Sequence, residues 1–119
     1  MTAQRLAKSS RLTRAADIRA LQTQGKRRRT DHLDLFSRPS PVECSRLGVI
    51  VPLYQRTAVQ RNLLRRRLRE IGRRDVLPCL AAATDVLVKA RGGAYSASFE
   101  TLRREIVRSL CPSSPGSAS

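Results

Sequence analysis

Apolar residues spaced three or four positions apart predict three helices, because a helix of about 3.6 residues per turn collects such positions on one face. The predicted helices cover residues 14–24, 57–72 and 98–110. A residue whose side chain can cap a helix start stands at or just before each of them: Thr13, Thr57 and Ser98. Gly25 and Gly72 can end the first two helices, and Pro78 follows a short distance beyond the second.

Three apolar runs between these helices predict β-strands. They cover residues 32–36, 46–52 and 85–90. The run at 32–36 alternates polar and apolar residues, as a half-buried strand does. The β-branched residues of RLGVIVP, at 46–52, favour a central strand. The order α-β-β-(β)-α-β-α, with room for one further strand before the second helix, predicts an α+β fold built as a two-layer sandwich.

The chain length of 119 residues allows one compact domain. We expect a single domain at residues 12–111, a basic flexible segment at 1–11 before it, and a disordered Ser- and Pro-rich tail at 112–119. No run approaches the ~18 apolar residues that cross a bilayer, and no apolar stretch of signal-peptide type stands near the start. We therefore expect a cytoplasmic protein.

The three cysteines, Cys44, Cys79 and Cys111, predict neither a disulfide framework nor a zinc site. Their number is odd, and no pair has the C-x-x-C spacing. We expect buried or unreactive thiols.

The charge pattern changes the picture from a generic α+β domain to one that binds a polyanion. The formal net charge is +15 and the pI about 11.6, which is typical of proteins that bind nucleic acid or an anionic surface. Residues 1–29 contain nine basic residues and one acidic residue, and residues 56–74 contain eight and one. Arg outnumbers Lys by 21 to 3, and the planar guanidinium group suits both phosphates and base stacking.

The second predicted helix has a cationic face and an apolar face. At ~100° per residue, six of its polar residues fill one arc of roughly 140°: Arg61, Asn62, Arg65, Arg66, Arg69 and Arg73. Arg67 and Arg74 project into the opposite half. The opposite half holds Val59, Leu63, Leu64, Leu68 and Ile71. A merely solvated helix is the alternative, but arginines four apart repel one another unless an anion compensates. The helix has one acid, Glu70, which we expect to hold an arginine in place.

No catalytic constellation can be built from the sequence. His32 is the only histidine, the nine acids are scattered, and no Gly-rich phosphate loop is found. Any reaction is therefore expected to be carried out by a partner. The four aromatics do not form the pattern of a base-stacking sheet. Tyr54 precedes the basic helix and is suited either to stacking on a base or to packing against that helix.

Four segments of the chain, read in order, resemble the protein subunit of bacterial ribonuclease P. The family's basic segment, first helix and closing Gly are matched by RLTRAADIRALQTQGK, and its central strand by RLGVIVP. Its arginine-rich signature helix is matched by TAVQRNLLRRRLRE, and its last strand, turn and helix by VLVKARGGAYSASFETLRREI. The match covers about residues 11–110, and the shared spacing of four elements makes it specific.

The resemblance implies a fold like the second domain of a small-subunit ribosomal protein, with a left-handed βαβ crossover. It implies that a catalytic RNA subunit, with Mg²⁺ at the RNA, removes the 5′ leader from precursor tRNA. The protein would bind that RNA and the leader, without a cofactor, membrane or small-molecule substrate of its own. The candidate RNA-binding residues are Arg56, Arg61, Asn62, Arg65, Arg66, Arg69 and Arg73. Further candidate contacts to the leader or the RNA are Arg11, Arg14, Phe36 and Tyr54.

The chain departs from the family pattern at several positions. Leu63 stands where the signature helix usually has a basic residue, and Leu53 where a Lys commonly follows the central strand. The first helix has Ile18 and Leu21 where aromatics are usual. These changes affect the expected leader cleft more than the basic helix.

Two other functions are compatible with parts of the pattern. A ribosomal or architectural RNA-binding protein would share the charge and the fold. A protein of the membrane surface is disfavoured, because the apolar face of the basic helix has no Trp or Phe.

Overall fold

The computed structural model describes residues 11–111. The predicted tail at 112–119 and nearly all of the predicted basic segment lie outside these described residues. The elements follow the order α-β-β-β-α-β-α. They are α1 (Ala15–Gln24), β1 (Lys26–Arg29), β2 (Leu33–Pro39), β3 (Arg46–Ile50), α2 (Ala58–Ile71), β4 (Thr84–Ala90) and α3 (Phe99–Leu110). The additional strand for which the sequence left room is β1, formed by the basic run KRRR.

The four strands form one mixed sheet in the order β1-β2-β4-β3. β1 and β2 are antiparallel, as are β2 and β4, whereas β3 runs parallel to β4 and is joined to it through α2. The prediction of a central strand at 46–52 is wrong, since β4 lies inside the sheet and β3 at its edge. β3 is nevertheless half-covered, because Leu12 N–H donates to Leu47 O at 2.8 Å and residues 11–12 run beside it. The left-handed sense of the crossover stays a prediction.

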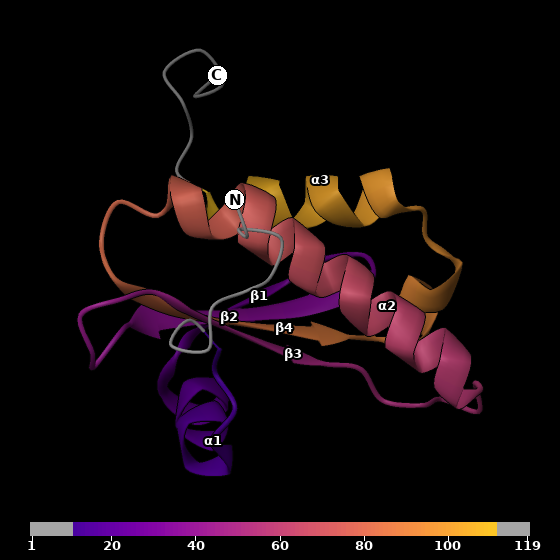
Figure 1. Ribbon diagram of the computed structural model, residues 1–119, viewed down its shortest axis with the longest axis horizontal. Coiled ribbons are helices and arrows are strands. Elements are labelled where there is room, and N and C mark those ends of the chain that lie inside the picture. The colour runs from indigo at the N-terminus through magenta and orange to yellow at the C-terminus, as the bar shows by residue number, and fades with distance from the viewer. Residues whose placement is uncertain (1–10, 112–119) are drawn as a thin grey trace, which may run out of the picture.

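Helices cover both faces of the sheet (Figure 1). α2 and α3 lie together on one face and complete the main core with Leu33, Leu35, Val86 and Val88. α1 packs on the opposite face, where Leu21 meets Phe36 and Leu87 in a smaller cluster. The predicted two-layer arrangement is the sheet with α2 and α3, and α1 adds cover on the other side. Because of α1, β2 is buried on both faces at residues 33–36 and not half-buried as its alternation predicted.

The capping predictions hold at two of the three helix starts. Thr57 accepts from Gln60 N–H at 3.1 Å while the Gln60 side chain accepts from Thr57 N–H, which makes a complete capping box for α2. Ser98 accepts from Thr101 N–H at the start of α3. The prediction for Thr13 is wrong, because α1 has Arg14 at its N-cap and no side-chain cap. Gly25 ends α1 as expected, its N–H donating to Leu21 O.

Gly72 is the C-cap residue of α2, which ends at Ile71 as the sequence predicted. It keeps right-handed helical torsions, and the chain continues through a π-helical turn (Gly72–Val76) and a 3₁₀ turn (Leu77–Cys79). The physical reason for a glycine here is proximity to β3, since a Cβ on Gly72 would lie 2.3 Å from Leu47 Cδ2. The glycine thus sets how closely α2 approaches the sheet.

A disulfide joins Cys79, in the turn after α2, to Cys111 at the end of α3, with a Cα–Cα distance of 5.6 Å. The prediction of unreactive thiols is wrong for this pair. The two residues are 32 positions apart, and the fold, not their spacing, brings the ends of α2 and α3 together. Cys44 takes no part in the disulfide and is half-buried.

The register of β3 on β4 is fixed by a buried ion pair. Asp85 is fully buried and accepts two bonds from Arg46, at 2.9 Å from Nε and 2.7 Å from Nη2. The hydrogen bond to Asp85 outweighs burial and raises the pKa of Arg46. Removing one partner of such a pair would leave a buried charge uncompensated. The pair therefore holds the edge strand on which α2 rests.

Candidate nucleic-acid interface

α2 presents a narrower apolar stripe to the core than the sequence predicted. Leu64, Leu68 and Ile71 are buried, but Val59 is 78% exposed and Leu63 is 42% exposed. The first turns of α2, which include Val59, project past the end of β3 (Figure 1). The apolar face that the sequence indicates therefore does not coincide with the buried face at Val59 and Leu63. The buried side is rotated toward Arg61 and Arg65, which are half-buried.

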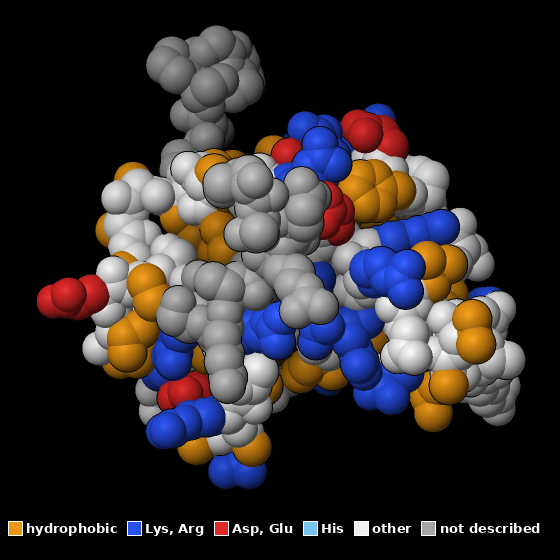
Figure 2. Space-filling view, in the orientation of Figure 1, with side chains coloured by type: hydrophobic (Ala, Val, Ile, Leu, Met, Phe, Trp, Pro, Cys, Tyr) orange, Lys and Arg blue, Asp and Glu red, His pale blue; other side chains and the backbone are white. Residues whose placement is uncertain are grey.

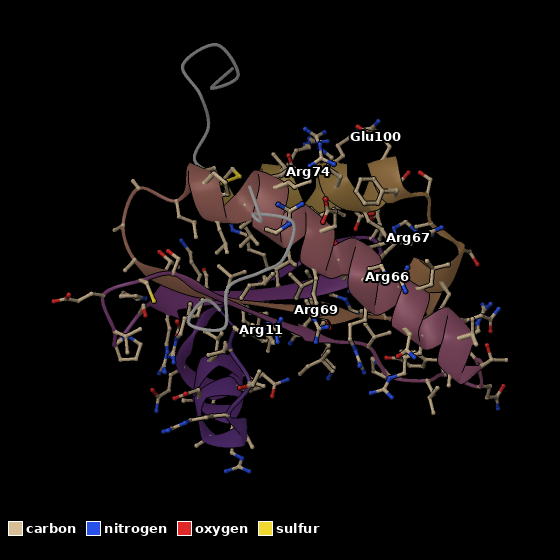
Figure 3. All side chains as sticks on the ribbon, viewed as in Figure 1. Arg11, Arg66, Arg67, Arg69, Arg74 and Glu100 are labelled. Atoms are coloured by element: carbon tan, nitrogen blue, oxygen red, sulfur yellow. A yellow bond between two sulfur atoms is a disulfide. The ribbon has the colours of Figure 1, made fainter. Side chains whose placement is uncertain are left out.

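The arginines of α2 differ in how far their guanidinium groups are already engaged. Arg66 and Arg69 are exposed, as is Asn62. Arg61 donates from Nε to Val51 O at 2.8 Å, so part of its donor set fastens the helix to the end of β3. In Figure 2 blue side chains form a band along the flank of α2, and Figure 3 places Arg66 and Arg69 on this side.

Arg73 lies at the end of α2 and is paired. Its Nη2 lies 2.6 Å from Glu70 Oε2, and Arg74 lies 3.6 Å from the same oxygen. The expectation that Glu70 holds an arginine is confirmed. Arg73 consequently offers less free charge to an anion than Arg66 or Arg69 does.

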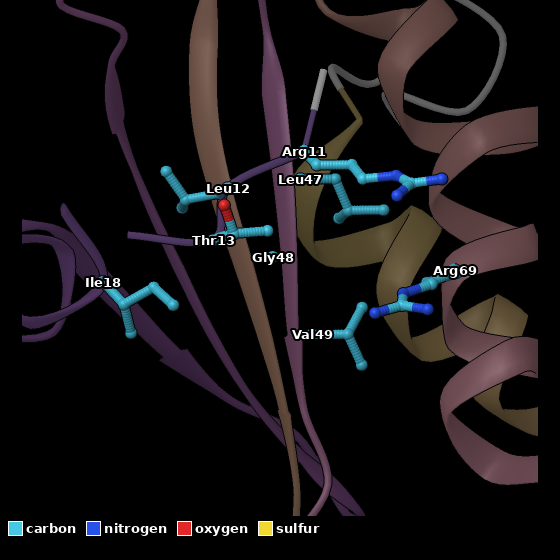
Figure 4. A pocket seen from close by; sticks show the side chains of 8 residues that line it. All are labelled: Arg11, Leu12, Thr13, Ile18, Leu47, Gly48, Val49 and Arg69. Atoms are coloured by element: carbon cyan, nitrogen blue, oxygen red, sulfur yellow. The ribbon is translucent and has the colours of Figure 1, made fainter. Parts of the chain in front are cut away.

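Arg11 and Arg69 face each other across a pocket between residues 11–13, β3 and α2 (Figure 4). The pocket has a volume of about 190 Å³ and is lined also by Leu12, Thr13, Ile18, Leu47, Gly48 and Val49. Gly48 allows residues 11–12 to lie beside β3, because a Cβ at Gly48 would lie only 3.0 Å from Leu12 O and would displace these residues. Partial burial lowers the pKa of Arg69, and the charges of Arg65 and Arg11 lower it further. None of its lining residues is acidic, so the pocket is suited to an anion such as a phosphate.

The remaining candidates fall in three different environments. Arg56 is exposed, with its guanidinium carbon 5.0 Å from the centre of the Tyr95 ring. Arg14 is exposed at the start of α1, on the other side of the sheet from α2. Tyr54 is 47% exposed in the turn between β3 and α2. Phe36 is only 6% exposed and packs in the small core cluster, so we leave it out of the interface proposed below.

Strand β1 is a basic surface to which the sequence analysis gave no role. All four of its residues, Lys26 to Arg29, are exposed at the sheet edge opposite β3. The signal was the charge run itself, which contributed only to the net charge of residues 1–29 in the sequence analysis. Likewise, the sequence suggested Arg11 as a contact, but only the pairing of residue 11 with Leu47 brings it opposite Arg69.

The described residues offer charge and a shaped surface for a polyanion. Among residues 11–111, no group of three or more His, Cys, Asp or Glu is placed to hold a metal ion. Within the same range, no helix is both long and apolar enough to pass through a membrane. What the arrangement can do is hold a polyanion along α2 and over the Arg11–Arg69 pocket.

A comparison with protein-family models matches residues 6–111 to the family described as Ribonuclease P. The chain belongs to the ribonuclease P protein family. Among relatives, it is 30% identical over 106 residues to the ribonuclease P protein component of Picosynechococcus sp., covering 88% of this chain and 90% of that one. It is 33% identical over 105 residues to the component from Microcystis aeruginosa, covering 84% and 87%.

Solved structures of the ribonuclease P protein share the fold. The Thermotoga maritima protein superposes with a TM-score of 0.73 and 27% identity, covering 84% of this chain and 94% of that one. The Staphylococcus aureus protein superposes with a TM-score of 0.71 at 21% identity, over 87% and 93%, and supports the fold alone. The protein component belongs to an endoribonuclease ribonucleoprotein of tRNA processing, in which it is the non-catalytic part.

Proposed function

We propose that this chain binds the ribonuclease P RNA subunit and precursor tRNA through the arginine interface, which we define as Arg11, Arg56, Arg61, Asn62, Arg65, Arg66, Arg69 and Arg73. In this role it assists the catalytic RNA in removing the 5′ leader. The observation that supports the proposal best is the Arg11–Arg69 pocket. Two guanidinium groups that converge without a carboxylate in the lining repel each other until an anion lies between them.

Within the interface, the members contribute unequally. Arg65, Arg66 and Arg69 are one, three or four residues apart on α2 and carry no salt bridge among the described residues. We assign the main phosphate contacts to these three and Arg11. Arg61 and Arg73 already donate to Val51 O and to Glu70, so they orient the helix and add less binding energy. Arg14, beyond the sheet, is a candidate for a separate contact.

The hydrolysis itself is assigned to the RNA subunit, where Mg²⁺ would be held by RNA phosphates. The protein then raises the local concentration of precursor tRNA and neutralises charge where two RNA strands approach. The expected compartment is the cytoplasm, where tRNA precursors are made. There, disulfides are rare and most often transient, so the Cys79–Cys111 pair would be exposed to reduction.

A reconstitution experiment tests the role of the interface. Cleavage of precursor tRNA by the RNA subunit at low Mg²⁺ should be stimulated by the wild-type protein. The Arg65→Ala, Arg66→Ala double variant should stimulate much less, with an unchanged circular-dichroism spectrum. Arg104→Ala is the matched control, since Arg104 is exposed on α3 and removes the same charge away from the interface. Equal stimulation by the double variant and by wild type would contradict the assignment.

The protein alone should cleave nothing. Highly purified chain, incubated with precursor tRNA and Mg²⁺ but without the RNA subunit, is expected to give no 5′ processing. Gel analysis of 5′-labelled precursor checks this, with the reconstituted complex as the positive control. Reproducible cleavage by the isolated chain would show that a catalytic site has been overlooked.

A further inference from the structure

The turn between β3 and α2 holds two residues in a conformation that ordinary side chains avoid. Tyr54 has φ 48° and Gln55 has φ 64°, and they are the non-glycine residues with positive φ among residues 11–111. Arg56 N–H donates to Leu53 O at 2.8 Å and closes the turn. Two successive left-handed residues form the kind of turn that Asn and Gly normally occupy. Keeping Tyr and Gln there costs stability, and such strain gathers at functional sites.

The strained turn leaves the Tyr54 ring on the surface. A Cβ placed on Gly92 would lie 3.8 Å from Tyr54 Cγ and 3.9 Å from Cδ1, so the ring lies close to Gly92 with room for a methyl group between them. Tyr54 remains 47% exposed. Next to it, Tyr95 donates its hydroxyl to Pro52 O at 2.7 Å and carries the Arg56 guanidinium over its ring. The turn is thus held to the protein by Tyr95, while the Tyr54 ring is exposed to solvent.

Apolar exposure in the described part of the chain is concentrated around this turn. Four of its five exposed large hydrophobic residues lie between positions 53 and 63: Leu53, Tyr54, Val59 and Leu63. They are interleaved in sequence with Arg56, Arg61 and Asn62, members of the arginine interface. A partner that fits both features has flat apolar faces joined by negative charges, which describes an unpaired stretch of RNA.

We propose that Tyr54 is a stacking platform for one unpaired nucleobase of an RNA strand whose phosphates are bound by the arginines of α2. The inference rests on the RNA-binding role proposed above and adds a base-dependent contact to it. Phosphate contacts respond only to charge, whereas stacking requires a base. The position of Tyr54 before the helix start places that base just ahead of the phosphates held along α2.

The test compares two short oligomers with the same phosphates. One is an oligoadenylate of about ten nucleotides, within the length that such surfaces bind, and the other is the same oligomer without bases. The wild-type chain should bind the oligoadenylate more tightly. Tyr54→Asn keeps a residue that tolerates the turn but removes the ring, and it should lose that preference, with a loss of about 5-fold to 100-fold for oligoadenylate alone.

Two further variants make the result specific. Gln55→Asn changes the same turn and keeps the ring, so its preference should match that of wild type. Arg66→Ala should weaken both oligomers alike, because it removes a phosphate contact. If Arg66→Ala behaves in this way but Tyr54→Asn keeps the base preference, stacking at Tyr54 is wrong while the arginine interface stands. If Arg66→Ala changes neither oligomer, it is the proposed interface that fails.

Fluorescence gives a second measurement that does not depend on a loss of affinity. The chain has no Trp, so Tyr54→Trp introduces a single indole at the proposed platform. The oligoadenylate should quench its emission at saturation, and the oligomer without bases should not. Equal emission changes with both oligomers would overturn the proposal and would leave the exposed apolar residues as a surface for a protein partner.

Discussion

Gly72 shows how a single residue sets how closely α2 approaches the sheet. Its missing side chain lets α2 lie against Leu47, whose Cδ2, Cδ1 and Cγ would all be within 3.2 Å of a Cβ. Leu47 is 2% exposed and in the core, so it cannot turn away. The sequence identified this glycine as the helix end, which it is, but not its close approach to Leu47, because that contact depends on the fold.

Gly72→Ala is therefore expected to destabilise the protein, although alanine favours helices. Overpacking of a core typically costs about 1–3 kcal/mol, which exceeds the gain of up to about 1 kcal/mol from helix propensity. Gly92→Ala is the control, since a Cβ there makes only ordinary contact at 3.8 Å. Thermal unfolding of the two variants checks this. A Gly72→Ala protein as stable as wild type would contradict the account of the α2–β3 contact.

Glu105 is a second single residue with a testable effect, because its contacts make the stability of the fold depend on pH. Burial alone would raise the pKa of Glu105, but hydrogen bonds from the Thr30 hydroxyl, at 2.5 Å, and from His32 outweigh it and lower the pKa. A lowered pKa contributes stability above the ordinary value of about 4.5, and that contribution is lost as the pH falls through the folded-state value.

Denaturant unfolding between about pH 3 and pH 6 should show this loss in the wild-type chain, over the range where a glutamate of ordinary pKa begins to protonate. Glu105→Gln should be less stable than wild type at neutral pH and should lose less stability on acidification. Glu100→Gln, at an exposed position on α3, should follow the wild-type curve. Parallel curves for wild type and Glu105→Gln would contradict the role of the Thr30–His32–Glu105 contacts.

At the scale of elements, the sequence predicted where helices and strands form better than how they meet. The second and third helices, two of the three caps and the strand at β4 agree with the structure, because periodicity and capping are local properties. The place of β3 at the sheet edge, the rotation of α2 that exposes Val59 and the pairing of Arg11 with Leu47 depend on contacts distant in sequence. The arginine face was predicted for the same local reason, while the Arg11–Arg69 pocket needed the fold.

The Cys79–Cys111 disulfide is an element-scale contact of this kind, joining the ends of α2 and α3. A disulfide typically stabilises a protein by about 2–4 kcal/mol, mainly by restricting the unfolded chain. The oxidised protein should therefore melt higher than the reduced protein or Cys111→Ser, while all three remain folded. Calorimetry with and without a thiol reductant checks this. Cys44→Ser is the control and should retain the effect of the reductant. No response to reductant in wild type would show that the disulfide adds no stability.

At the scale of the whole molecule, the chain supplies positive charge for binding, whereas catalysis is assigned to the RNA subunit. The chain has a net charge of +15 and only nine acidic residues, and several of these are used within the fold. Asp85 pairs with Arg46, Asp34 with Arg91, Asp75 with Arg103 and Glu70 with Arg73. Acids thus fasten arginines that hold the structure together, and the arginines at the pocket and at the exposed side of α2 are left for an anion. A protein built in this way keeps its fold and still presents arginines whose charge a polyanion can neutralise.

The salt dependence of RNA affinity tests this central claim most directly. If about six basic residues of the arginine interface and the N-terminal segment together each meet a phosphate, the slope of log K against log salt concentration should be about −4 to −5. Arg66→Ala should make the slope shallower by roughly one unit or a little less. Glu70→Gln should change it little, because that residue holds Arg73 and does not face the RNA. Titrations of wild type and both variants at several KCl concentrations give these slopes. A wild-type slope near zero would contradict an interface that works by neutralising phosphates.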